Sequence, residues 1–241
     1  PATIIFTKFI GARLGDHIED TMRNSAELCS EMIERQYQAD VLMLEGLAVR
    51  MSAAFENDPQ MAIERLVSTA ERYGMKRIAF SYPDGTTLTT DGVYVNTKGF
   101  AHFESALQGN VVLTSQISDA DDGEQVNIYS TPVYHEDTRE VLGVMSALYS
   151  SDVFEDVLSA SSFDGEGYTY IVDSTGAVVV NSKHKNAIPE LENLFDYMES
   201  IDNVIELNVL QYSLENGQEG FLELDRGFKK YDIFSYYRKI D

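Results

Sequence analysis

A helical stripe of apolar residues runs through the first quarter of this chain. Apolar residues recur at steps of three or four from Leu14 to Phe55, and Asn57-Asp58-Pro59 ends the run. Such steps predict an amphipathic helix, and the residue before a proline avoids the helical region. A helix over residues 11–56 would be roughly 70 Å long at 1.5 Å per residue. Because this exceeds the width of an ordinary domain, other elements must pack along it. The spacing also fits a coiled-coil dimer.

Short strands follow a second helix, which is predicted from Pro59 to Tyr73 and closed by Gly74. The tripeptide Pro83-Asp84-Gly85 indicates a tight turn between two of these strands. The elements expected after the second helix are strands at 76–82 and 86–90, a short helix at 99–107, strands at 111–116, 125–135 and 141–149, and a helical turn or two at 152–158.

The last third of the chain repeats this order of elements. Aligning Gly85 with Gly176 superposes the strand, turn and strand around each glycine. The elements expected here are strands at 167–173 and 177–181, a helix at 202–214, and strands at 220–225 and 230–238. This second unit has no counterpart of strand 141–149, so it is predicted to lack its last strand. Either the sequence ends early or another chain fills that sheet edge.

The expected fold is therefore α+β, with one long helix and two tandem units. The predicted division is a long N-terminal helix at 1–57, a first lobe at 58–160 and a second lobe at 161–241. The chain begins at Pro1 without an initiator methionine, which predicts a piece of a longer protein.

The charge balance excludes several classes of partner. The chain carries 18 Lys and Arg against 40 Asp and Glu, a formal net charge of −22. Such a surface repels nucleic acid and is disfavoured on anionic membranes. The single cysteine, Cys29, excludes an internal disulfide and a multi-cysteine zinc site. No apolar run approaches the roughly 18 residues of a spanning helix.

The sequence gives little evidence for a catalytic site or a metal site. The four histidines are scattered along the chain, and the acidic run 119–124 lacks the spacing of a calcium loop. We therefore expect no enzymatic activity, no metal and no cofactor in this chain. A secreted hydrolase would need two converging ionisable groups that the spacing does not supply.

Four motifs carry a family resemblance. They are Tyr82-Pro-Asp-Gly-Thr-Thr87, Phe100-Ala-His-Phe-Glu-Ser-Ala-Leu-Gln-Gly109, Tyr129-Ser-Thr-Pro-Val-Tyr134 followed by Val141-Leu-Gly-Val-Met145, and Gly165-Glu-Gly-Tyr-Thr-Tyr-Ile-Val-Asp-Ser-Thr-Gly176. In this order the chain resembles the double Cache sensor domains of bacterial transmembrane receptors. The resemblance implies a long N-terminal helix followed by two PAS-like lobes with antiparallel sheets. The first would be membrane-distal and the second membrane-proximal.

The resemblance also implies a location and an output. The chain would be an ectodomain on the extracytoplasmic face of the cell membrane, attached through flanking segments absent from this sequence. The fourth motif is most similar to ectodomains joined to diguanylate cyclases, while histidine kinases and chemoreceptors carry the same module. A homodimer through the long helix is a further expectation.

The resemblance places a small-molecule pocket in the distal lobe, among the sheet, the strand-to-helix loop and the short helix. The residues predicted to bind the ligand are Tyr94, Lys98, Phe100, His102, Phe103, Tyr129, Thr131 and Ser146. Aromatic walls would come from Tyr94, Phe103 and Tyr129, and polar contacts from Lys98, His102 and Thr131. Phe103 as plain core and Tyr129 as a sheet residue facing solvent are the structural alternatives.

A free amino acid is disfavoured as the ligand. The amino-acid-binding members of the family have an arginine where Phe100 stands and an aspartate where Leu148 stands. Both charges of an amino acid would then lack partners, and buried charges need them. A carboxylate held by Lys98, an uncharged ligand, or no ligand at all fits better.

Two hypotheses therefore compete. The first is a sensor that binds a small molecule in the distal lobe and relays a shift to a cytoplasmic output domain. The second is a structural dimerisation module of a membrane protein whose lobes bind nothing.

Overall fold

The computed structural model describes residues 2–10, 17–151, 167–182, 184–188, 191–225 and 232–240, and the helical turn predicted at 152–158 lies outside them. The chain forms two compact units. The central unit is Tyr37–Ser151, and the split unit combines Pro1–Gln36 with Asp152–Asp241. These limits differ from the predicted division at 57 and 160, because the long helix is shared between the two units.

The long helix predicted from the apolar stripe is present as α1 (His17–Asn57), 41 residues without a break. Its stripe is buried as expected, with Met22 and Cys29 at 0% exposure and Leu44 at 1%. The helix begins at His17, and residues 11–16 lie outside the described part of the chain. In α2 (Pro59–Arg72), the side chain of Asp58 caps the first turn by accepting from the Met61 amide.

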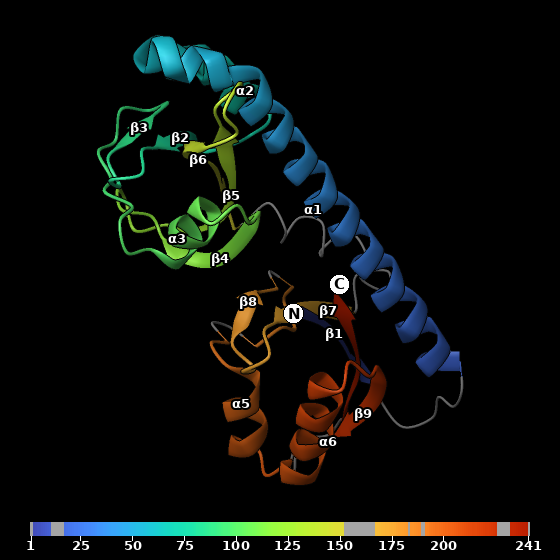
Figure 1. Ribbon diagram of the computed structural model, residues 1–241. Helices are drawn as coiled ribbons and strands as arrows, with labels where there is room; N and C mark the ends of the chain where they lie inside the picture. Colours follow the sequence, from blue (N-terminus) through green and yellow to red (C-terminus); the bar gives the residue numbers. More distant parts are fainter. Residues whose placement is uncertain are drawn as a thin grey trace. The chain divides into compact units, whose positions relative to one another are not determined.

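The sheet of the central unit is antiparallel, with strand order β3-β2-β6-β5-β4 (Figure 1). Its elements are β2 (Arg77–Ser81), β3 (Thr87–Thr89), α3 (Ala101–Leu107), β4 (Val112–Ser118), β5 (Gln125–Tyr134) and β6 (Val141–Ser150). Each lies where the sequence predicts it to within about two residues. Short α3 packs on one face of this sheet through Phe103, Ala106 and Val144.

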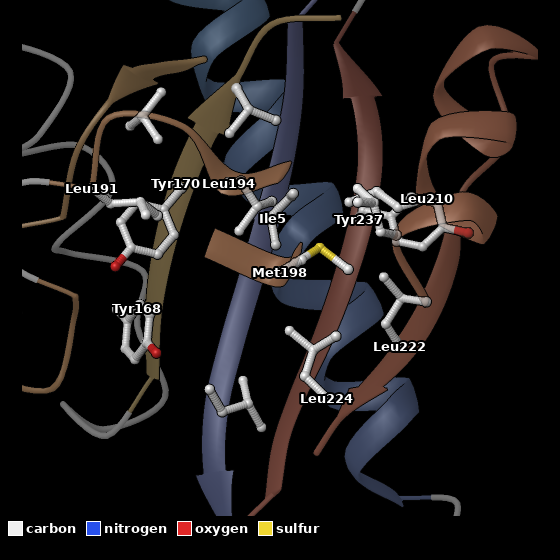
Figure 2. Close-up of a cluster of buried hydrophobic side chains, with 14 of the residues drawn as sticks. Ile5, Tyr168, Tyr170, Leu191, Leu194, Met198, Leu210, Leu222, Leu224 and Tyr237 are labelled. Carbon is white, nitrogen blue, oxygen red and sulfur yellow. The ribbon is translucent and has the colours of Figure 1, made fainter. Parts of the chain in front are cut away.

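The split unit has the sheet order β8-β7-β1-β10-β9. Its elements are β1 (Ala2–Ile10), β7 (Gly167–Val172), β8 (Val178–Val180), α5 (Leu194–Ser200), α6 (Val204–Glu215), β9 (Gly220–Leu224) and β10 (Asp232–Ile240). Helix α5 was not predicted, although Asn193 caps it by accepting from the amides of Phe195 and Asp196. Figure 2 shows the core of this unit, where Tyr168, Tyr170 and Met198 pack together.

The prediction that the second lobe lacks its last strand was wrong. Strand β1 lies between β7 and β10, and Ile5 pairs with Tyr170 on one side and Tyr237 on the other. This is the place that β6 holds between β2 and β5 in the central unit. The N-terminus therefore supplies the missing strand, and residues 1–57 are not all helix. The β-branched residues of Thr3-Ile-Ile-Phe-Thr7 favour a strand.

The two predicted repeats share their turn. Gly85 and Gly176 have φ angles of 89° and 81°, in the region that favours glycine. The Gly85 amide donates to the Tyr82 carbonyl, and the Gly176 amide donates to the Asp173 carbonyl, at 2.8 and 3.1 Å. The alignment of these two glycines in the sequence is thereby confirmed as a structural equivalence.

Removing residues 1–10 tests the place of β1. Both neighbours of β1 would lose their ladder partner, so the amides of β7 and β10 are expected to lose protection from hydrogen exchange. The amides of β2, β5 and β6 should keep theirs, because the central unit makes its own sheet. The control Ile5→Val should cost only about 0.5–1.5 kcal/mol. Unchanged protection of β7 and β10 after the deletion would contradict the assignment.

Candidate functional site

A cavity opens on the face of the central sheet that carries α3. Its lining comes from all five strands, the loop between β3 and α3, α3 itself and the loop between β4 and β5. The lining residues are Arg77, Ala79, Ser81, Thr87, Thr89, Val95, Thr97, Phe100, His102, Ile117, Ser118, Asp119, Ala120, Val126, Ile128, Ser146 and Leu148. The space open to the centres of water molecules is about 80 Å³. Since about 10–15 Å³ of such space holds one water, there is room for several waters or a small metabolite.

The internal repeat explains why the central unit is hollow here. With Gly85 aligned on Gly176, the cavity residues Arg77, Ala79 and Ser81 of β2 correspond to Tyr168, Tyr170 and Val172 of β7. In the split unit those three side chains are buried in the core. Figure 2 shows the two tyrosines there. Where the split unit has two tyrosine rings and a valine, the central unit has an arginine, an alanine and a serine.

The same exchange affects the neighbouring strands. Thr87 and Thr89 of β3 stand at the positions of Val178 and Val180 in β8. Ser146 of β6 pairs with Ala79, as Ile5 of β1 pairs with the equivalent tyrosine. The central unit thus replaces large apolar side chains by small or hydroxyl-bearing ones on this one face of the sheet.

Most hydroxyl protons in the cavity wall already have an acceptor. Thr87 and Thr97 both donate to the carbonyl of Gly85, at 3.2 and 3.3 Å. Thr89 donates to the carbonyl of Val93 at 2.9 Å. The hydroxyls of Ser146 and Ser130 share a hydrogen bond of 2.8 Å. These oxygens keep lone pairs that can accept from a guest.

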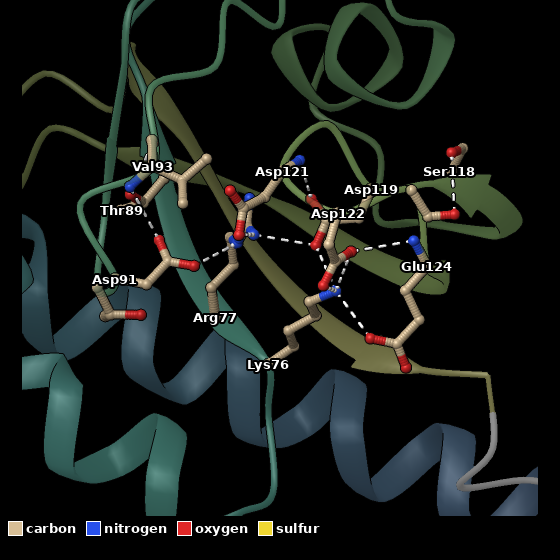
Figure 3. Close-up of polar contacts among 12 residues, drawn as sticks. Lys76, Arg77, Thr89, Asp91, Val93, Ser118, Asp119, Asp121, Asp122 and Glu124 are labelled. Carbon is tan, nitrogen blue, oxygen red and sulfur yellow. Dashed lines mark hydrogen bonds and ion pairs between the residues drawn. The ribbon is translucent and has the colours of Figure 1, made fainter.

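Arg77 and Asp119 of the cavity wall belong to a charged cluster, whose contacts are shown in Figure 3. Arg77 is 2% exposed, and its guanidinium lies 2.9 Å from a carboxylate oxygen of Asp119 and 2.7 Å from one of Asp91. Asp119 is buried as well, with a side chain 1% exposed. A guanidinium removed from water needs such partners, because an unpaired buried charge is strongly destabilising. Arg77 thereby ties the loop after β3 and the loop after β4 to strand β2.

Lys76 holds the outer side of the same cluster. Its ammonium lies 2.7–2.8 Å from Asp119, Asp122 and Glu124. Burial lowers the pKa of Lys76, but the hydrogen bonds to these three carboxylates outweigh it and raise the pKa above its usual value. The hydrogen bond from Lys76 is also the main cause that lowers the pKa of both Asp122 and Glu124. Carboxylates of the acidic loop 119–124 are therefore already paired with Lys76 and Arg77.

His102 is the polar side chain of α3 that faces the cavity. It is 5% exposed, and its ring lies 5.7 Å from the ring of Phe100. Neither ring nitrogen has a hydrogen-bond partner within the described part of the chain. Burial lowers the pKa of His102, so the imidazole is neutral at pH 7 and offers one donor and one acceptor.

The structure places the eight predicted ligand-binding residues in three environments. Phe100, His102 and Ser146 line the cavity together. Tyr94 is 75% exposed, and Lys98 is exposed on the same loop, and neither side chain lines the cavity.

The other three predicted residues are buried away from the cavity. Phe103 packs in the core with Ala106, as its structural alternative predicted. Tyr129 and Thr131 lie on the opposite face of β5, because alternate residues of a strand point to opposite faces. There Tyr129 contacts α1, with its ring 5.8 Å from that of Tyr37. It is 1% exposed, so the alternative of a sheet residue facing solvent was wrong, and it is not among the residues that line the cavity.

Arg77 and Asp119 were not among the site residues predicted from the sequence. A single arginine near the start of a strand gives no local sign of burial. The signal was in the repeat: comparing β2 with β7 position by position shows an arginine where the partner has a tyrosine. Among the described residues, no group of three or more His, Cys, Asp or Glu side chains is arranged to hold a metal ion. None of the described helices is long and apolar enough to cross a membrane.

No protein-family model matches the chain. Solved structures of bacterial chemoreceptor domains share its fold. The ligand-binding domain of the Pseudomonas aeruginosa amino acid chemoreceptor PctC, in complex with GABA, is 15% identical with a TM-score of 0.63, over 92% of this chain and 99% of that one. That of Pseudomonas fluorescens CtaA, with L-serine, is 14% identical with a TM-score of 0.65, over 93% and 98%.

A third example comes from another organism. The sensory domain of Campylobacter jejuni Tlp3, with isoleucine bound, is 11% identical with a TM-score of 0.64, over 91% of each chain. These likenesses establish the fold, and they confirm the predicted α+β architecture with a long helix and antiparallel sheets.

Replacing Asp119 tests the buried ion pair. Asp119→Asn keeps the shape but removes the charge opposite Arg77, so we expect the central unit to lose on the order of 3 kcal/mol of unfolding free energy. The control Asp121→Asn removes a half-exposed carboxylate 4.0 Å from the same guanidinium and should change stability far less. Denaturant titration measures both variants, and equal losses would contradict a structural role for the pair.

His102 predicts a pH dependence of stability. Burial lowers the pKa of His102 in the folded protein below the usual value of about 6.5, so the unfolded chain binds more protons as the pH falls below about 7. The resulting loss of folding free energy is absent well above pH 6.5 and grows as the pH falls towards the pKa of His102 in the folded protein. We expect His102→Gln to flatten the fall in melting temperature between pH 7.5 and 5.5, roughly the range over which an ordinary histidine titrates. Parallel curves for the two proteins would contradict it.

Proposed function

We propose that this chain is an extracytoplasmic ligand-sensing domain of a membrane-bound bacterial receptor, and that the cavity of the central unit binds its small-molecule ligand. The observation that carries the proposal is the difference between the repeats. The same sheet positions are filled by Tyr168 and Tyr170 in the split unit and by Arg77 and Ala79 around a cavity in the central unit.

The fold comparisons support this assignment. PctC, CtaA and Tlp3 are described as chemoreceptors, and their domains of this fold were solved with GABA, L-serine and isoleucine. These domains are ligand-binding or sensory modules, which also favours a non-enzymatic role for this chain. In the terms of the sequence prediction, the central unit would be the membrane-distal lobe.

Strand β5 offers a path from the cavity to α1. Val126 and Ile128 face the cavity, whereas Asn127 and Tyr129 point to the opposite face of the sheet. On that face the Tyr149 hydroxyl donates to Asp40 of α1 at 3.4 Å. A guest that binds one packing of the sheet and α1 better than another would shift the population between them.

Strand β5 also carries a buried polar side chain without a hydrogen-bond partner. Asn127 is 1% exposed, and both polar atoms of its side chain lack a hydrogen-bond partner among the described residues. Buried amides normally find partners, because an unsatisfied buried group costs about 1–3 kcal/mol. A packing of the sheet that gave Asn127 a hydrogen-bond partner would regain this free energy.

The output domain and the oligomer belong to this proposal as well. The diguanylate cyclase predicted from the sequence stays a prediction, and the chemoreceptor neighbours favour a chemotactic output instead. A homodimer through α1 is supported by Leu28, Leu42 and Val49, which are 54–76% exposed and stand at multiples of seven residues.

A metabolite library in a thermal-shift assay tests the sensing function. A ligand at a hundred times its dissociation constant stabilises the folded state by about 2.7 kcal/mol, which raises the melting temperature by several degrees. Phe100→Ala should weaken that shift, because Phe100 lines the cavity. Tyr94→Ala is the matched control on the same loop and should keep the full shift.

Two outcomes would contradict the proposal. A ligand whose shift survives Phe100→Ala and His102→Gln unchanged binds elsewhere. A library without a hit, together with a tight dimer in sedimentation, would favour the structural dimerisation module.

A further inference from the structure

We infer that the cavity of the central unit takes an uncharged guest with a largely apolar body and one hydrogen-bonding group, and that it rejects free amino acids. The inference rests on the proposed function and adds the chemical class of its ligand. It follows from the way the charges and protons of the cavity wall are already used.

The ionised side chains that line the described cavity neutralise each other. These are Arg77 and Asp119, whose charged groups lie 2.9 Å apart. A carboxylate guest at Arg77 would join the carboxylates of Asp91 at 2.7 Å and Asp121 at 4.0 Å, and like charges at such distances repel. An anionic ligand is therefore disfavoured.

An ammonium guest has no free partner either. Asp119 is the one carboxylate among the described lining residues, and the same oxygen of it already receives Lys76 at 2.8 Å and Arg77 at 2.9 Å, so an ammonium at that oxygen would compete with both cations. A displaced cation would lose the buried carboxylate of Asp119 and keep only more exposed ones, Asp91 for Arg77 and Asp122 and Glu124 for Lys76, which is costly for a cation held away from water. A zwitterionic amino acid meets both obstacles at once.

Polar recognition falls to His102. Its neutral ring is 95% buried, faces the cavity and has no hydrogen-bond partner among the described residues. It can accept from a hydroxyl or amide N–H and donate to its oxygen. The hydroxyls of Thr87, Thr89 and Thr97 donate to backbone carbonyls, so towards a guest they act as acceptors.

Most of the rest of the wall is apolar, and the hydroxyls of the lining residues Ser81, Ser118 and Ser146 are already hydrogen-bonded within the protein. Val95, Phe100, Ile117, Ile128 and Leu148 line it with side chains that offer no hydrogen bond. Each gains only by removing apolar surface from water. An alcohol, phenol or amide on a hydrocarbon body satisfies this wall and His102 together.

Matched compounds of one skeleton separate the possibilities. One set is 3-methylbutan-1-ol, 3-methylbutanoate, 3-methylbutylamine and leucine, and the other is benzyl alcohol, benzoate, benzylamine and phenylalanine. Thermal shift and calorimetry on the whole chain are expected to find binding of the alcohol of at least one set. The three charged members of that set should bind at least tenfold more weakly.

Two variants test whether the alcohol binds in the cavity. His102→Leu should weaken binding of the alcohol at least tenfold, and Tyr94→Ala on the nearby loop should leave it unchanged. Circular dichroism and the melting temperature of the unliganded variants establish that both fold. If the affinity for the alcohol is the same in His102→Leu as in the unchanged protein, the inference is overturned.

The remaining outcomes distinguish this inference from the proposed function. If the acid, the amine or the amino acid binds more tightly and depends on Phe100, the cavity is a sensor site and the inference of an uncharged ligand is overturned. If no member of either set binds, the inference is also overturned, and the metabolite library decides separately whether the cavity is a ligand site.

Discussion

The buried guanidinium of Arg77 is the constraint on which the central unit depends. It stands on β2, and its partners Asp91 and Asp119 belong to the two loops that frame the cavity. Because the charge cannot be left unpaired away from water, both loops are held against the sheet. The same ion pair leaves neither ionised residue of the described cavity lining, Arg77 or Asp119, without a partner. The same ion pairs thus hold the two loops beside the cavity and leave its described wall without an unpaired charge.

The two repeats show how one backbone plan gives a solid unit and a hollow one. Both have a five-stranded antiparallel sheet, whose central strand is β6 in one unit and β1 in the other. Strand β6 follows its neighbour β5 in the sequence, whereas β1 comes from the other end of the chain than its neighbours β7 and β10. Tyr168 and Tyr170 pack the face of β7, whereas Arg77 and Ala79 leave space on β2. A few side chains on one face of a sheet, and not its topology, therefore decide whether a ligand site exists.

The sequence predicts the local elements well and the distant pairings poorly. The stripe of α1 and the turn at Gly85 depend on neighbouring residues, so periodicity and turn chemistry reveal them. Strand β1 pairs with β10 more than two hundred residues away, and nothing near Ile5 signals that partner. Among the candidate site residues, Phe100, His102 and Ser146 line the cavity. Tyr129 does not, because a shift of one residue along a strand exchanges the faces of the sheet.

A crystal structure of the chain with a bound guest tests the central claim most directly. The account predicts density for an uncharged molecule between Phe100 and His102, with the pair of Arg77 and Asp119 still joined. Density for a carboxylate or ammonium group that has replaced one partner of that pair would contradict it. So would a guest held elsewhere while the cavity stays empty.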